Sequence, residues 1–111
     1  MLVRDGDRLV GLALCHTAPL VEGRTREELR VLKLALADDA ALDAMLGALC
    51  DYAKRSGTRR FAVRVQGEYP GMYRTMVTAG ARVRWTDLRM ALGGFEERRA
   101  DRGVVLSNWE I

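Results

Sequence analysis

The stretch from residue 29 to residue 80 constrains the fold most, because it reads as strand, helix, strand and helix with turn residues at the ends. Residues 29–36 form an apolar run of strand length, and Asp38 and Asp39 follow as a pair that favours the start of a helix. Apolar residues then recur at helical spacing: Leu42, Met45, Leu46, Leu49 and Ala53. The first strand therefore leads directly into an amphipathic helix.

The second half of this stretch repeats the pattern. Gly57 suits the end of the helix, and residues 60–65 alternate between apolar and polar as a second strand. Pro70 suits a first helical turn, and Gly80 suits the position just past a short helix over residues 72–79. A strand, a helix and a second strand in this order predict a right-handed parallel unit, whose first strand end commonly holds phosphate-bearing ligands.

The two ends of the chain predict further strands. Residues 1–4 and 9–16 flank Asp5-Gly6-Asp7, which predicts an antiparallel hairpin. Apolar and polar residues alternate over 82–92, but the apolar residues change from odd positions (Val83, Trp85) to even positions (Leu88, Met90, Leu92). This change indicates a strand with a bulge near Thr86 and Asp87. Residues 104–111 are expected to form a last strand, paired with 82–92 as a hairpin. The predicted fold is a single α/β domain over residues 1–111: a hairpin, then strand, helix, strand, helix, strand and strand in one mixed sheet.

Composition narrows the classes of partner. The chain has 111 residues, a formal charge of +3 and a pI near 9.2. Its arginines are scattered over every expected element, so binding of nucleic acid through Arg59, Arg60, Arg64, Arg82 and Arg84 rests on charge alone and is not expected. No apolar run has the roughly 18 to 20 residues of a membrane span, and the amino end lacks a charged region followed by an apolar stretch. The sequence therefore predicts a cytoplasmic protein without a membrane partner.

The two cysteines give no sign of a metal site. Cys15 and Cys50 stand far apart, without a CxxC spacing and without a neighbouring histidine. Both are expected to be buried free thiols.

Several segments together resemble the GCN5-related N-acetyltransferase superfamily: Leu29-Arg30-Val31, the helix from Met45 to residue 57, and residues 73–90. The resemblance covers most of the chain but only the later part of the family's domain. The family's first strand and first two helices have no counterpart. It implies a shortened acetyltransferase-like domain with a mixed sheet.

The resemblance also implies where acetyl-CoA would bind. Main-chain groups at the end of strand 29–36 would hold the pantetheine, and the turn over residues 37–42 would hold the pyrophosphate. The implied cofactor-binding residues are Leu34, Leu36, Ala37, Ala40 and Tyr69. The family's glycine-rich turn is missing, and Asp38 and Asp39 stand in its place, where a simple helix cap is the alternative interpretation.

Three residues are candidates for acid–base catalysis. Met76 stands where the family has a tyrosine that protonates the departing thiolate, and Tyr73 lies one helical turn earlier as a possible substitute. The alternative role of Tyr73 is packing of its ring on the sheet. Glu28, next to Glu27 at the start of the strand, and His16 are the candidate bases, although a lone histidine is usually structural or exposed.

Two functions follow from the resemblance. The first is transfer of an acetyl or acyl group from coenzyme A to an amine. The second is a non-catalytic domain for dimerisation or regulation, because a domain without the early helices leaves one sheet face uncovered. A second copy is the simplest cover and a preceding domain is the alternative, with Phe61 and Val63 or Val83 and Trp85 as candidate contacts.

Overall fold

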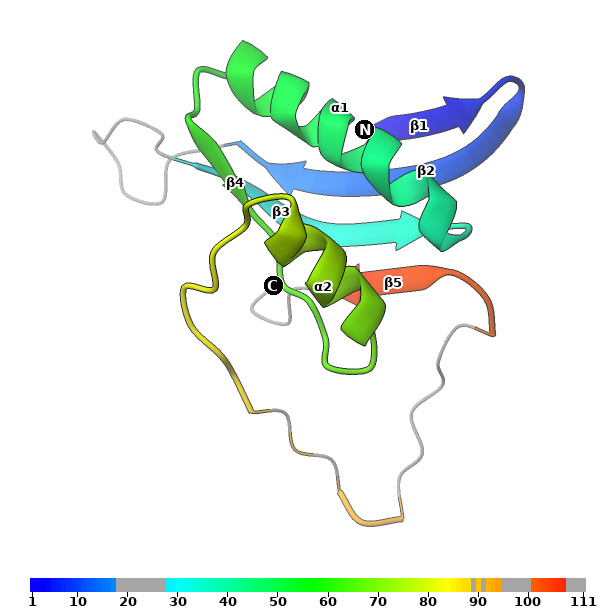
Figure 1. The fold of residues 1–111 in the computed structure, drawn as a ribbon, viewed down its shortest axis with the longest axis vertical. Helices are drawn as coiled ribbons and strands as arrows, with labels where there is room; N and C mark the ends of the chain where they lie inside the picture. Colours follow the sequence, from blue (N-terminus) through cyan, green and yellow to red (C-terminus); the bar gives the residue numbers. More distant parts are fainter. Residues whose placement is uncertain (18–27, 89, 91, 95–100, 108–111) are drawn as a thin grey trace.

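A mixed sheet of five strands carries two helices on one face in the computed structural model, which describes residues 1–17, 28–88, 90, 92–94 and 101–107 (Figure 1). The elements in chain order are β1 (Leu2–Asp5), β2 (Arg8–His16), β3 (Glu28–Leu36), the 3-10 turn η1 (Asp39–Ala41), α1 (Leu42–Arg55), β4 (Arg60–Ala62), α2 (Pro70–Thr78) and β5 (Val104–Ser107). The chain is therefore an α/β domain, as predicted.

The predicted hairpin and the parallel unit are both present. β1 pairs antiparallel with β2 around a turn in which Gly6 takes a φ of 59°. β3 pairs parallel with β4 after the intervening helix α1, which ends before Gly57 at a φ of 75°. Glycine is favoured at both points because a left-handed backbone costs other residues about 1 to 2 kcal/mol.

β3 is the strand around which the sheet is built. β2 occupies one edge of β3, and β4 and β5 share the other. β4 pairs only with Glu28, Leu29 and Arg30, and β5 pairs antiparallel with the remaining stretch from Lys33 to Leu36. Because β4 leaves β3 after three residues, the second half of this edge is free to receive β5.

The carboxyl-terminal half of the chain differs from the prediction in three ways. The strand expected over residues 60–65 ends at Ala62, and the described part of 82–92 contains no strand. The predicted hairpin between 82–92 and 104–111 is therefore wrong, since β5 pairs with β3; residues 108–111 lie outside the described part. The reason is burial: on β3 the Val104 and Leu106 side chains enter the core, with 3% and 1% exposed.

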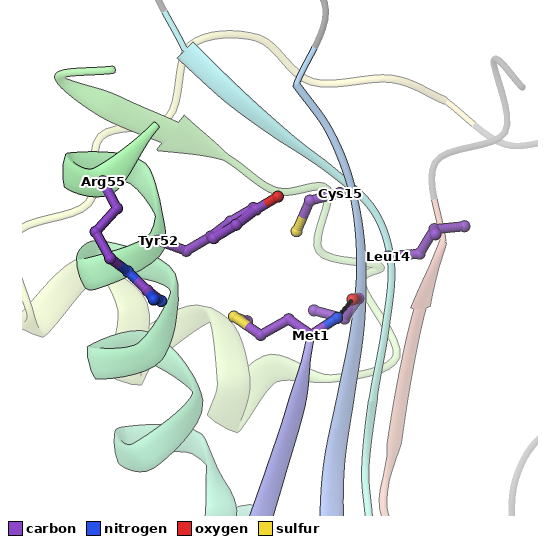
Figure 2. Close-up of a pocket in the computed structure, with 6 residues that line it drawn as sticks. Met1, Leu14, Cys15, Tyr52 and Arg55 are labelled. Carbon is purple, nitrogen blue, oxygen red and sulfur yellow. Dashed lines mark hydrogen bonds between the residues drawn. The ribbon is translucent and has the colours of Figure 1, made fainter. Parts of the chain in front are cut away.

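The core lies between the sheet and the two helices. Its fully buried large side chains are Leu29, Leu34, Met45, Leu49 and Leu106. The helix α1 packs so closely over β2 that a Cβ at Gly11 would stand 2.8 Å from Cε of Met45. Both pictures place α1 and α2 on the same side of the sheet (Figures 1 and 2).

Among the described residues, both helices lie on this one side, and none of them forms a helix over the opposite face of the sheet. Leu12 stands opposite Leu2 on β1 and opposite Ala35 on β3, and Ala35 stands opposite Val105, so these side chains share that face. Leu9 pairs with Arg4, two residues along β1 from Leu2, and Leu14 pairs with Lys33, two residues along β3 from Ala35. Leu9 and Leu14 therefore lie on the same face. The large apolar residues of this bare face are 46 to 54% exposed: Leu2, Leu9, Leu12, Leu14 and Val105.

Gly103 offers a test of how closely the start of β5 approaches the end of β3. It has a φ of 75°, and a Cβ there would overlap the carbonyl oxygen of Leu36. We expect Gly103→Ala to lower the free energy of unfolding by about 3 kcal/mol or more, measured by urea denaturation. Gly57 is the matched control, because it has the same φ of 75° with nothing within 4 Å of the added methyl. Gly57→Ala should cost only about 1 kcal/mol; equal losses would contradict the close approach of β5.

Candidate functional site

The predicted site residues fall at both ends of β3. Glu28 begins the strand, and His16, the last residue of β2, stands opposite Arg30. Leu34 and Leu36 are at the other end, followed by Ala37. Since a strand rises about 3.3 Å per residue, the two ends lie roughly 26 Å apart. The structure thus separates the two candidate bases from most of the residues expected to hold acetyl-CoA.

The main chain of Leu34 and Leu36 is already paired with β5. The N–H of Val105 donates to the hydroxyl of Tyr69 at 3.3 Å, so it points away from β3. Ala35 and Val105 are therefore a non-hydrogen-bonded pair, and by the alternation of an antiparallel ladder the hydrogen-bonded pairs are Leu34 with Leu106 and Leu36 with Val104. The main-chain groups expected to hold a pantetheine are those that hold β5.

The other three expected cofactor-binding residues, Ala37, Ala40 and Tyr69, lie in three different environments. The N–H of Ala37 donates to the carbonyl oxygen of Val10 at 2.9 Å, on the β2 side of β3. Ala40 lies exposed in η1. Tyr69, half-buried ahead of α2, accepts the hydrogen bond from Val105. Its hydroxyl therefore helps to position β5.

The turn after β3 carries two solvent-exposed carboxylates, those of Asp38 and Asp39. The side chain of Asp38, the N-cap residue of η1, makes no capping hydrogen bond, so the expected side-chain cap is wrong at this residue. The Asp38 carbonyl accepts a hydrogen bond from the N–H of Ala41 at 3.3 Å. Two carboxylates at a helix start oppose a phosphate. With β5 in place as well, this edge does not fit the pantetheine and pyrophosphate of acetyl-CoA.

Glu28 lies at the centre of an arginine cluster. Arg84 donates two hydrogen bonds to its carboxylate, at 2.6 and 3.0 Å. Arg60 and Arg30 approach the same carboxylate at 3.5 and 3.9 Å. The hydrogen bonds from Arg84, followed by the charges of the three arginines, hold the pKa of Glu28 below its ordinary value. A carboxylate that is ionised and bonded in this way is a weak base, so the geometry favours a structural role.

Arg84 joins this cluster to the segment after α2. Its guanidinium lies 4.4 Å from the ring centroid of Trp85, and the hydrogen bonds to Glu28 raise the pKa of Arg84 further. The pairing spans 56 residues of sequence between Glu28 and Arg84, so periodicity alone could not reveal it. Glu27, the neighbouring candidate base, lies outside the described residues.

Tyr73 and His16 are accessible but come from different elements. Tyr73 lies on α2 with 48% of its surface exposed, so it is not enclosed by the sheet, and its N–H donates to the Tyr69 carbonyl as part of the helix start. His16 is exposed at the end of β2.

A pocket that the sequence did not predict lies between α1 and the first two strands (Figure 2). It measures about 350 Å³ and is lined by Met1, Ala13, Leu14, Cys15, Tyr52 and Arg55. The Cys15 side chain faces Tyr52 across the pocket, whereas that of Leu14 points to the far side of the sheet. Burial raises the pKa of the Cys15 thiol, so it is protonated near neutral pH. Cys50, expected to be buried, is exposed on α1.

Two classes of site can be checked across the described residues. None of their His, Cys, Asp and Glu side chains form a group of three or more that could hold a metal ion. No helix within this part of the chain has the length and apolar character needed to cross a membrane.

Comparisons with known proteins support the fold. No protein-family model matches the chain, and no curated protein matches it. Among solved structures, the crystal structure of a point mutant of TTHA1254 from Thermus thermophilus is similar, with a TM-score of 0.60 and 20% sequence identity, over 87% of this chain and 71% of that chain. At this identity the likeness concerns the fold alone.

The Glu28 cluster predicts a pH-dependent contribution to stability. Because the folded pKa of Glu28 is depressed from 4.5, its contribution is present above that value and is lost as the pH falls through the folded pKa. We expect Glu28→Gln to lower the free energy of unfolding by about 1 kcal/mol near pH 7. The difference from wild type should shrink below about pH 4.5 in urea titrations. A difference that stays constant down to pH 3 would rule out this ionic role.

Proposed function

We propose that this chain is an acetyltransferase-like domain that acts as a non-catalytic self-association module. The observation that carries the proposal is the bare face of the sheet, where five large apolar side chains stand half-exposed: Leu2, Leu9, Leu12, Leu14 and Val105. Both helices cover the other face (Figure 1). α/β domains bury sheet faces under further elements, and an exposed apolar face of this kind marks an interface.

The chemistry at β3 supports association over catalysis. β5 fills the edge that would hold an acyl-CoA, and its Val104 and Leu106 side chains are part of the core. Glu28 is bonded to Arg84 and not presented to a substrate. Removing β5 would expose two core side chains, at about 1.5 to 3 kcal/mol each, before a ligand could pair with β3.

A second copy of the chain is the partner that the bare face suits. A two-fold dimer uses the same surfaces on both subunits, so each copy can cover the bare face of the other. Lys33 is the charged residue beside Leu14, and its Nζ donates to the hydroxyl of Ser107 at 3.2 Å. This bond holds the ammonium toward β5 and away from β1.

Sedimentation of the wild-type protein tests self-association. We expect a dimer at micromolar concentrations, and Leu14→Glu should convert it to a monomer by placing a charge on the apolar face. The variant should keep its fold, since the new carboxylate stands across from Lys33 on β3. The matched control is Val77→Glu, which changes an exposed residue of α2 on the covered side of the sheet. A wild-type protein that stays monomeric would overturn the proposal.

Acyl transfer from acetyl-CoA to an amine is the second candidate function. It is favoured by the parallel pair of β3 and β4, which separates after three residues and could admit an extended ligand if β5 moved. The resemblance would then assign the acid–base roles to Tyr73, Glu28 and His16.

Calorimetric titration with acetyl-CoA separates the two functions. The self-association module predicts no binding up to millimolar concentration, because β5 and the carboxylates of Asp38 and Asp39 oppose the ligand. Micromolar binding together with acetylation of an amine, lost in Tyr73→Phe, would replace the non-catalytic proposal with the enzymatic one.

A further inference from the structure

A second group of exposed apolar residues follows α2. Residues 83–88, 90 and 92, which we call the arm, belong to no helix or strand. Figure 1 draws residues 81–88 in yellow, leaving the helices and the sheet. Leu88, Met90 and Leu92 are 89, 86 and 83% exposed, and Val83 and Trp85 are about half-exposed. These are the side chains whose alternation predicted a strand.

Two ion pairs of the described residues bind the base of the arm to the rest of the domain. Arg84 binds Glu28 at 2.6 Å, and Asp87 binds Arg64 at 2.7 Å. Both contacts precede Leu88. The three most exposed apolar residues of the arm therefore come after its last described ion pair and extend beyond it.

The arm and the bare face hold most of the exposed large apolar side chains among the described residues. Every large apolar side chain that is exposed there belongs to one of these two groups, except Tyr73 and Val77 on α2. The bare face lies on the side of the sheet opposite the helices, and the arm leaves from α2 on the helix side.

We propose that the arm of each copy docks on the bare face of a second copy, so that a two-fold dimer exchanges its arms. This inference rests on the proposed self-association. In a two-fold interface each contact occurs twice, so one type of contact buries both apolar surfaces of both subunits.

The size of the two surfaces fits a stable dimer. A standard interface buries about 800 Å² on each partner, and each large side chain that is half-exposed or more contributes roughly 100 Å². The bare face alone offers five such residues, and the arm offers five more. Either surface by itself falls short of a standard interface, whereas the two together reach it.

The decisive variant changes the end of the arm. We expect Leu88→Ser, Met90→Ser and Leu92→Ser together to weaken dimerisation at least 100-fold in sedimentation, with an unchanged thermal midpoint at low protein concentration. The fold should be unaffected because these side chains are more than 80% exposed. The matched control is Tyr73→Ser with Val77→Ser, which removes exposed apolar residues outside both surfaces and should leave the dimer intact.

A disulfide experiment locates the contact between copies. Two proteins are made in a Cys15→Ser, Cys50→Ser background, one with Leu14→Cys and the other with Met90→Cys. Mixing and mild oxidation should give a crosslinked heterodimer in preference to either homodimer. A Tyr73→Cys protein replaces the Met90→Cys protein in the control and should not crosslink.

The outcomes separate this inference from the proposed function. A monomeric wild type would overturn both. A wild-type dimer that survives the triple arm variant would overturn arm exchange and leave self-association through the bare face alone. A dimer that depends on the arm but gives no crosslink with Leu14→Cys would overturn docking on the bare face.

Discussion

The shared edge of β3 is the constraint on which the rest of the structure depends. A strand has two edges, and in this chain β2 takes one while β4 and β5 divide the other. β4 keeps only three residues of pairing, so the main chain from Lys33 to Leu36 needs another partner, because unpaired backbone groups beside a core are costly. β5 supplies that partner and brings Val104 and Leu106 into the core. The same pairing that completes the domain closes the edge where a ligand could add.

Closing this edge has a consequence elsewhere in the chain. Residues 82–92 have the alternation of a strand, yet β5, their expected partner, is bound to β3. Their base is held by the ion pairs of Arg84 and Asp87, and the apolar residues beyond are left in solvent. Among the described residues, the helices likewise cover only one face of the sheet. In a single copy, both the apolar residues of this segment and one face of the sheet are exposed to solvent, and association can bury both at once.

Glu28 illustrates how a candidate catalytic group can serve the fold. Its position at the start of β3 matches the expected base, but three arginines from β3, β4 and the segment after α2 converge on it. Their charges keep the carboxylate ionised and join the arm to the sheet. A residue needed to anchor a segment 56 positions away is poorly placed to exchange protons with a substrate.

The sequence by itself determined the local elements of this protein. The Asp-Gly turn, the apolar run of β3, the helical period of α1 and the terminal glycines, Gly57 and Gly80, fix structures whose causes lie within a few residues. Through its resemblance to acetyltransferases, the sequence also predicted one sheet face without helices. The tertiary structure alone decided which strand pairs with β3, which arginines surround Glu28, and that the Tyr69 hydroxyl binds the main chain of β5. The physical reason is that partner choice depends on which distant side chains fill the core, and periodicity carries no information about that.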